Sequence, residues 1–189
     1  MNSRDFFIFP ENIDIFVFDA TPLLSGIDIG IFNELCYTTS EIIDEIKRPV
    51  ISNKIDNFIL NRSLSIVEVP NSFIKKIQQL ARKSGDLKSL SQGDISVLGC
   101  GLYLNASYRK QFGVGNKNHA AVYLVSDDYS IQNVARLAHI NTKSFKKKGI
   151  KQFIRWQSYC PNCHKEYIPE FFGSKCPNCS AIIKRRPKK

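Results

Sequence analysis

Short β-rich segments alternate with helical patterns along most of this chain, and this alternation limits the folds that it can adopt. The β-rich segments are 13–20 (IDIFVFDA), 35–39, 64–70, 121–125 and 140–145. Strands joined through helices form right-handed crossovers and a parallel sheet. The strands are continuously apolar, as expected for a parallel sheet that is covered on both faces. The pattern therefore predicts an α/β fold with a central parallel sheet.

The helical patterns have recognisable ends. A helix is expected from about Ser40, where Thr38 and Glu41 have the spacing of a capping box, to Pro49. Further helices are expected over 53–62, 72–85, 90–104 and 129–139. Residues 105–119 break the helical spacing, so we expect a long loop there, of the kind that is usually functional or disordered.

The net charge of +10 is distributed unevenly. Residues 1–142 carry 14 Lys and Arg against 15 Asp and Glu, whereas residues 143–189 carry 13 against 2. A basic segment of this kind indicates a polyanionic partner, most simply nucleic acid, with a solubilising tail as the alternative. An anionic membrane surface is disfavoured because the basic residues do not lie on an amphipathic helix.

The composition excludes two other classes of protein. With 43% apolar residues the chain can bury a core, so it is not a disordered chain. No apolar run reaches about 20 residues, and the N-terminus has no basic stretch followed by a long apolar one, so we expect no secretory signal. We therefore expect a cytoplasmic protein with no membrane partner.

Carboxylates follow the strands. Asp19 ends the first strand, and the adjacent Asp127 and Asp128 follow the strand at 121–125. In open parallel sheets, ligands bind beyond the carboxyl ends of the strands. Adjacent carboxylates at such a point are costly unless a cation or hydrogen bonds hold them.

Two helices bring further acids toward the same edge of the sheet. Glu45 lies at the border of an apolar stripe on its helix, and Asp94 lies in the first turn of the helix that starts near Ser91. Five carboxylates are thus candidates for a Mg²⁺ or Mn²⁺ site, since hard cations prefer oxygen ligands. Three of them also have a plainer interpretation: Asp127 as a helix N-cap, Asp94 as a cap with Ser91, and Glu45 paired with Arg48.

The C-terminal cysteines have the spacing C-x2-C-x12-C-x2-C. The ligands Cys160, Cys163, Cys176 and Cys179 would complete a tetrahedral Zn²⁺ site with no open position, which makes the zinc structural. Two disulfides are the alternative, and the lack of a secretory signal disfavours them. Cys36 and Cys100 lie in apolar contexts and are expected to be ordinary buried residues.

The basic residues around this module are candidates for RNA contacts, with phosphates on the cations and bases on the interleaved aromatic rings. The alternative for the aromatic residues is that they pack the module itself. The candidates are Lys146, Lys147, Lys148, Lys151, Arg155, Lys175, Lys184, Arg185 and Arg186. The expected organisation is a domain over 1–147, a basic linker over 148–157, a zinc ribbon over 158–184 and a basic tail over 185–189.

Four stretches resemble the acidic motifs of PIN-domain ribonucleases, in the family's order: FVFDATPLL, TTSEIIDEI, LSQGDISVL and LVSDDYSIQNVA. The resemblance implies a Rossmann-like α/β/α sandwich and Mg²⁺- or Mn²⁺-dependent cleavage of single-stranded RNA. It places catalytic and metal-binding roles on Asp19, Glu45, Asp94 and Asp128, which stands two residues after Ser126. Asp127 is the second candidate in the last motif.

A narrower resemblance takes in the zinc ribbon and the KRRPKK end. The chain is similar to the Nin-one-binding family of ribosome-assembly endonucleases, in an archaeal-type form. This implies maturation of the 3′ end of small-subunit ribosomal RNA in a pre-ribosomal particle, without a small-molecule cofactor. The long segment 105–119 and the absence of Gly after Cys179 depart from the family pattern. A toxin-type PIN ribonuclease and a non-catalytic RNA-binding scaffold are the alternatives.

Overall fold

The computed structural model describes residues 8–47, 49–113, 121–146 and 148–188. A five-stranded sheet has the order β3-β2-β1-β4-β5, and every neighbouring pair of strands is parallel. The strands are β1 (Ile15–Phe18), β2 (Leu35–Thr38), β3 (Ser65–Ile66), β4 (Val122–Val125) and β5 (Asn141–Lys143). The prediction of an α/β fold with a central parallel sheet is confirmed.

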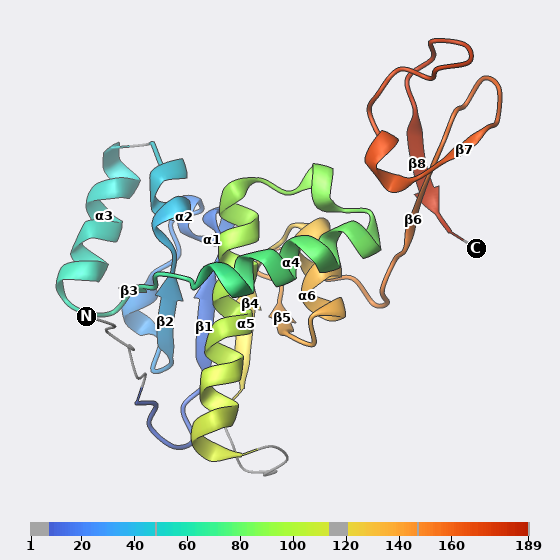
Figure 1. Ribbon diagram of the computed structural model, residues 1–189. Coiled ribbons are helices and arrows are strands. Elements are labelled where there is room, and N and C mark those ends of the chain that lie inside the picture. Colours follow the sequence, from blue (N-terminus) through green and yellow to red (C-terminus); the bar gives the residue numbers. More distant parts are fainter. Residues whose placement is uncertain (1–7, 48, 114–120, 147, 189) are drawn as a thin grey trace.

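Helices connect the strands and pack on the sheet (Figure 1). They are α1 (Ala20–Leu24), α2 (Ser40–Glu45), α3 (Pro49–Leu60), α4 (Asn71–Ser84), α5 (Gln92–Phe112) and α6 (Tyr129–Leu137), with short 3₁₀ turns at Ile29–Ile31 and Leu87–Ser89. The long helix α5 packs on β1 and β4, and α4 and α6 pack beside it. Among the described helices, none has the length and apolar character that a membrane span requires.

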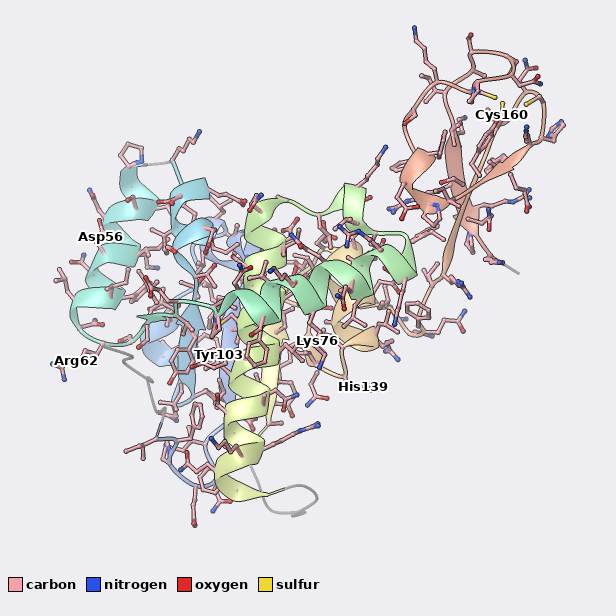
Figure 2. The ribbon with its side chains drawn as sticks, in the orientation of Figure 1. Asp56, Arg62, Lys76, Tyr103, His139 and Cys160 are labelled. Atoms are coloured by element: carbon pink, nitrogen blue, oxygen red, sulfur yellow. The ribbon has the colours of Figure 1, made fainter. Side chains whose placement is uncertain are left out.

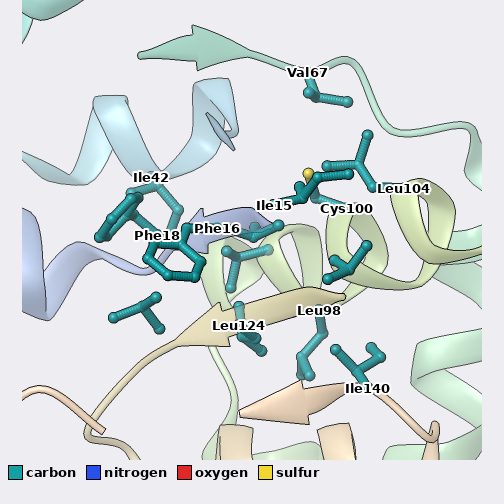
Figure 3. Close-up of a cluster of buried hydrophobic side chains, with 14 of the residues drawn as sticks. Ile15, Phe16, Phe18, Ile42, Val67, Leu98, Cys100, Leu104, Leu124 and Ile140 are labelled. Atoms are coloured by element: carbon teal, nitrogen blue, oxygen red, sulfur yellow. The ribbon is translucent and has the colours of Figure 1, made fainter. Parts of the chain in front are cut away.

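The core lies between the sheet and its helices (Figure 3). All four residues of β1 are buried, and Phe18 contributes one of the largest enclosed side chains. Ile42 of α2 and Leu98 of α5 are fully buried in the same cluster. Cys36 and Cys100 are buried too, as expected, and desolvation raises the pKa of the Cys36 thiol to about 12.

The expectation of a loop over 105–119 is wrong for its first half, because α5 continues to Phe112. Tyr108 is the reason: its ring is buried and packs against Phe9 at 5.6 Å and Phe112 at 4.7 Å between ring centroids. Tertiary packing thus extends a helix beyond the point where the sequence loses its helical spacing. The helix ends at Gly113, and residues 114–119 lie outside the described residues.

Two expected helix ends are also corrected. The N-cap of α2 is Thr39, not Thr38, and neither residue forms the expected capping box. Thr38 instead donates its hydroxyl to the carbonyl oxygen of Phe18 on the neighbouring strand (2.9 Å). Pro49 does not end a helix but begins α3, where a missing N–H costs nothing.

The C-terminal module is a second, antiparallel sheet with the order β7-β6-β8. Its elements are β6 (Trp156–Tyr159), β7 (Glu166–Tyr167), a 3₁₀ turn (Pro169–Phe171) and β8 (Lys184–Pro187). The module therefore begins at β6, before the expected residue 158. The expectation of a basic tail over 185–189 is wrong for residues 185–187, because they belong to β8, which pairs with β6. The rings of Tyr167 and Phe171 stack at 5.3 Å beside the cysteines, so these aromatic residues pack the module.

A buried ionic contact joins the module to the first domain. Asp86, which is 1% exposed, accepts hydrogen bonds from Arg185 of β8 (3.2 Å) and from the amide of Asn133 on α6 (2.7 Å). Next to it, Gly85 closes α4 in the left-handed conformation with φ +86°. A Cβ at Gly85 would lie 2.9 Å from the Cβ of Trp156, so the close approach of the module requires glycine.

Candidate active site

Asp19 links the end of β1 to the start of α1. It caps α1 by accepting the backbone N–H of Ala20 at Oδ1 (2.7 Å), and Ser126 donates its hydroxyl to Oδ2 (2.7 Å). The side chain is only 3% exposed. Desolvation raises the pKa of Asp19 to about 6, and the nearby carboxylates of Asp94 and Asp128 add to this rise. Asp19 is therefore a buried acid at the carboxyl end of the central strand.

Asp94 reaches the same place from the first turn of α5. It forms a capping box with Ser91, whose backbone N–H donates to Oδ2 of Asp94 (2.7 Å). The capping interpretation of Asp94 is thus correct, yet its pKa is raised by burial, with smaller contributions from the charges of Asp128 and Glu45. Capping and a place in the acidic group are compatible, because the cap orients the carboxylate.

Glu45 is the last residue of α2, and it is exposed. It accepts a hydrogen bond from the hydroxyl of Ser91 at Oε1 (3.1 Å), which brings the end of α2 to the start of α5. A Cβ at Gly93 would displace the Glu45 carboxylate, which is the far end of a flexible, exposed side chain, so Gly93 lets this carboxylate lie close to the first turn of α5. The alternative pairing of Glu45 with Arg48 lies outside the described residues.

The adjacent acids Asp127 and Asp128 differ in what they contact. Asp128 is exposed and is the N-cap of α6, since its Oδ1 accepts the backbone N–H groups of Ser130 (2.6 Å) and Ile131 (3.2 Å). Its charge acts on Asp19 and on Asp94. Asp127 is buried, and its carboxylate accepts backbone N–H groups of the segment that follows β5. The N-cap role expected for Asp127 therefore belongs to Asp128, which also faces the acidic group.

The residue types of this acidic group fit a hard divalent cation. We call Asp19, Glu45, Asp94 and Asp128 the acidic pocket. The pKa values of Asp19 and of Asp94 are raised mainly by desolvation and to a smaller extent by the neighbouring carboxylates, and a cation there would offset both effects. Mg²⁺ commonly binds through one or two carboxylates and keeps several waters. Among the residues that the structure describes, only the four cysteines place three or more ligand atoms within 4.8 Å of one another, so an ion at the acidic pocket would bind through one or two carboxylates and water.

The four cysteines form a closed site. Their sulfur atoms all lie within 4.8 Å of one another, with 3.4 Å between Cys160 and Cys179 and 3.6 Å between Cys163 and Cys176. Sulfur atoms at the corners of a tetrahedral zinc site are about 3.8 Å apart, given Zn–S bonds of about 2.3 Å. Figure 2 shows Cys160 at the far end of the module from the first domain. The donor set fits a structural zinc ion.

Both cysteine turns have the same backbone path. His164 and Ser180, the residues after each CPNC, have φ of +60° and +61°. Each donates its N–H to the carbonyl of the first cysteine of its turn, at 3.0 Å to Cys160 and 2.8 Å to Cys176. The missing glycine after Cys179 therefore leaves the turn geometry intact, with a left-handed non-glycine residue in its place.

The expected RNA-binding residues do not all have the same surroundings. Those that are exposed are Lys146, Lys148, Lys151, Arg155, Lys175, Lys184 and Arg186. Arg186 pairs with Glu166 at 2.7 Å on the surface. Arg185 differs, because its side chain is 20% exposed and its guanidinium holds the buried Asp86 at the junction, a role that the basic pattern did not indicate. Lys147 lies outside the described residues.

Sequence reasoning missed two contributors to this region. Ser126 is fully buried and fixes Asp19 through its hydroxyl. Asp86 is the buried partner of Arg185. A signal existed for Ser126, which directly follows the apolar strand β4 and so faces the same sheet edge as Asp19. For Asp86 no local pattern distinguishes it from an acid in an exposed turn.

The chain is similar to several known proteins. A family model described as the PIN domain of ribonuclease matches residues 16–104. Endoribonuclease Nob1 of Pyrococcus abyssi is 28% identical over 173 residues, covering 92% of this chain and 94% of that protein. Ribonuclease VapC1 of Thermoplasma acidophilum is 28% identical over 171 residues, covering 90% and 77%. The solved structure of the T. brucei RRP44 PIN domain has a TM-score of 0.47 at 14% identity, covering 70% of this chain and 77% of that one.

One further relative decides the family. Endoribonuclease Nob1 of Methanocaldococcus jannaschii is 30% identical over 172 residues, covering 90% of this chain and 76% of that protein. The match covers most of this chain, which also has a PIN-domain match over residues 16–104. The chain therefore belongs to the Nob1 family of PIN-domain endoribonucleases.

Proposed function

We propose that this protein is a Mg²⁺- or Mn²⁺-dependent endoribonuclease that cleaves single-stranded RNA, and that its substrate is the 3′ end of precursor small-subunit ribosomal RNA in a pre-ribosomal particle. The observation that carries the proposal is that Asp19, Asp94 and Asp128 stand at the starts of three separate helices and are close enough for their charges to affect one another. The names of the Nob1 relatives support the reaction class. The domain that contains the pocket is followed by the basic segment.

Each residue of the acidic pocket has a distinct part in this function. Asp19 supplies a buried carboxylate that Ser126 holds in place, and Asp94 and Asp128 supply carboxylates that their caps orient. Glu45, tied to Ser91, closes the side of the pocket at α2. A divalent cation held by these carboxylates would lower the pKa of a water and would stabilise negative charge on the phosphate. Hydrolysis of this kind leaves a 5′-phosphate and a 3′-hydroxyl.

The C-terminal module supplies RNA contacts in this proposal, and its four cysteines hold a structural Zn²⁺. Exposed lysines and arginines lie on the module and on the segment that leads to it. Binding to phosphates releases counterions, so affinity should fall steeply with salt. A flat dependence of affinity on salt would remove the electrostatic part of the proposal. A thiolate-bound zinc needs a reducing compartment, and we propose that the protein acts in the cytoplasm.

The direct test is to incubate the purified protein with precursor small-subunit ribosomal RNA and Mn²⁺ and to map new RNA ends. We expect one dominant cut near the mature 3′ end, and none with Asp19→Asn. New ends that persist with Asp19→Asn would show a contaminating nuclease or a different site. A dominant cut in transfer or messenger RNA would favour the toxin-type alternative. The scaffold alternative predicts RNA binding with no Mn²⁺-dependent cut in any of these RNAs.

A further inference from the structure

Asp127 lies beside the acidic pocket in the sequence, but its carboxylate is held by backbone groups of the segment that follows β5. The side chain is 3% exposed and accepts the backbone N–H groups of Phe145 (2.7 Å to Oδ1) and Lys146 (2.8 Å to Oδ2). A buried carboxylate is costly unless such donors hold it. Asp127 therefore fixes the backbone of the segment that follows β5.

The buried amide of Gln132 on α6 fixes the same segment at two further points. Gln132, which is 1% exposed, donates to Ser144 Oγ (3.1 Å) and to the carbonyl of Ser126 (2.8 Å). Its Oε1 accepts the N–H of Ile150 (2.8 Å). The residues just after β5 are therefore not a free linker but are fastened to the first domain.

The fastened segment presents an aromatic ring and a cation to solvent. Phe145 is 38% exposed although nearby polar groups define its backbone position, and the Lys146 ammonium lies 5.5 Å from the centre of its ring. The distance from the pocket is short. The backbone nitrogen of Phe145 is 2.7 Å from Oδ1 of Asp127, and the Cα atoms of Asp127 and Asp128 are about 3.8 Å apart. The Phe145 nitrogen therefore lies within about 10 Å of the Asp128 Cα.

We propose that Phe145 and Lys146 form a nucleotide-binding subsite beside the acidic pocket, and that Asp127 is the positioning residue that holds it there rather than a metal ligand. An unpaired base of the RNA stacks on the Phe145 ring, and its phosphate contacts the Lys146 ammonium. Stacking on a fixed ring tolerates any base, so the subsite places single-stranded RNA without selecting its sequence. The inference rests on the proposed function of the pocket.

The first test measures binding of a short single-stranded RNA to the inactive Asp19→Asn protein by fluorescence anisotropy. Phe145→Ala should weaken binding about tenfold, as expected for the loss of one stacked base, and Phe145→Trp should restore it. Phe153→Ala is the matched control, because Phe153 is 37% exposed on the same segment, and it should leave binding unchanged. Equal losses for both alanine variants would overturn the subsite.

An abasic scan of the same RNA identifies the nucleotide. One abasic position should weaken binding to the Asp19→Asn protein about tenfold, and it should cause no further loss once Phe145 is Ala. If the abasic penalty is undiminished with Phe145→Ala, the base does not stack on that ring. This arm needs no cleavage, so it reports on the subsite even if the proposed nuclease activity is absent.

The second test separates Asp127 from the pocket by kinetics. Asp127→Asn removes one acceptor for the backbone N–H groups, so it should raise KM several-fold while kcat stays within about threefold and the Mn²⁺ dependence is unchanged. Asp128→Asn should instead lower kcat and raise the Mn²⁺ concentration that is needed. A shifted Mn²⁺ requirement for Asp127→Asn would make Asp127 a ligand and overturn its positioning role.

Discussion

The acidic pocket and the cysteine site are built in opposite ways. The carboxylates of Asp19, Asp94 and Asp128 come from helix starts that are far apart in the sequence, and only the parallel sheet brings them together. The cysteines come from two turns of identical sequence, CPNC, and each turn already places two thiols side by side. A hard-ion site thus depends on the whole domain, whereas the sulfur site depends on two local turns and one small sheet.

The two sites also differ in how they treat charge. Burial and like charges raise the pKa of Asp19, so the pocket without an ion resists full ionisation. The cysteine site receives hydrogen bonds instead: Cys163 N–H lies 3.4 Å from the Cys160 sulfur, and Tyr167 lies 3.0 Å from the Cys176 sulfur. The bond with Tyr167 lowers the pKa of Cys176 to about 6 and so favours its thiolate, whereas the pKa of Cys160 is raised to about 11. The pocket is therefore suited to an exchangeable ion and the cysteine site to a permanent one.

The sharpest test of this contrast is the loss of one carboxylate. Asp19→Asn should reduce cleavage by about 10³-fold or more, because removing a ligand that stabilises the transition state by about 4 kcal/mol has this effect. RNA affinity should change less than twofold, since no basic contact is lost. Asp56→Asn is the control, as Asp56 is exposed on α3 (Figure 2). Full activity of Asp19→Asn in single-turnover assays would contradict the proposed site.

Loss of the cysteine site should weaken RNA binding and unfold the module, and it should not change the chemical step of RNA cleavage. Cys176→Ser should abolish the zinc content of the purified protein, which we expect to be one ion per chain, and should unfold the module, because small zinc modules need the metal to fold. We expect RNA affinity to fall at least tenfold, while the first domain keeps its circular dichroism. Unchanged zinc content by elemental analysis would show that the metal is not held here.

The junction offers a matched pair of arginines on one strand. Arg185→Met should destabilise the contact between the module and the first domain by about 3 kcal/mol, because it leaves Asp86 buried without its cation. Arg186→Met should cost less than about 0.5 kcal/mol, since Arg186 and Glu166 are both exposed.

The protein's single tryptophan reports on this junction, because the Arg185 guanidinium lies 4.4 Å from the Trp156 ring centre. Urea unfolding followed by Trp156 fluorescence should therefore show an earlier transition for Arg185→Met alone. Equal shifts for both variants would mean that burial does not distinguish the two ion pairs.

The raised pKa of Asp19 predicts a pH dependence with a definite sign. The folded protein binds this proton more tightly, with a pKa of about 6 against an ordinary value of 3.8. Without metal, the free energy of unfolding should therefore fall as pH rises from about 4 to about 6, by up to about 3 kcal/mol. Urea titrations of the wild type and Asp19→Asn isolate this effect as the difference between them. A difference that is constant over this range would contradict the assigned burial.

The smallest expected effect concerns the left-handed residue after the second cysteine turn. Ser180→Gly should stabilise the zinc-bound module by about 0.5 kcal/mol, because glycine adopts φ +61° without the Cβ penalty but loses more entropy on folding. The melting temperature of the module should rise slightly at constant zinc. Ser174→Gly, a change at a position without positive φ, should give no such gain.

Much of the fold could be predicted because its signals are local. Continuous apolar strands between helical patterns specified the parallel sheet, and Gly85 marked the end of α4. Predictions failed where a distant contact decides the local structure. Packing of Tyr108 against Phe9 carries α5 past its periodic part, and the bond from Thr38 to the neighbouring strand replaces the expected capping box.

The sequence by itself determined the order and type of the elements, the cysteine ligand set and the acids available at one edge of the sheet, because these follow from periodicity, spacing and strand direction. Only the tertiary structure decided that Asp127 is held by the segment after β5 while Asp128 caps α6 near Asp19, and which arginine is buried against Asp86. The two residues of each pair are of the same type and are neighbours in the sequence, so the sequence pattern does not distinguish them. Their roles diverge because hydrogen bonds and burial depend on neighbours that the chain supplies from elsewhere.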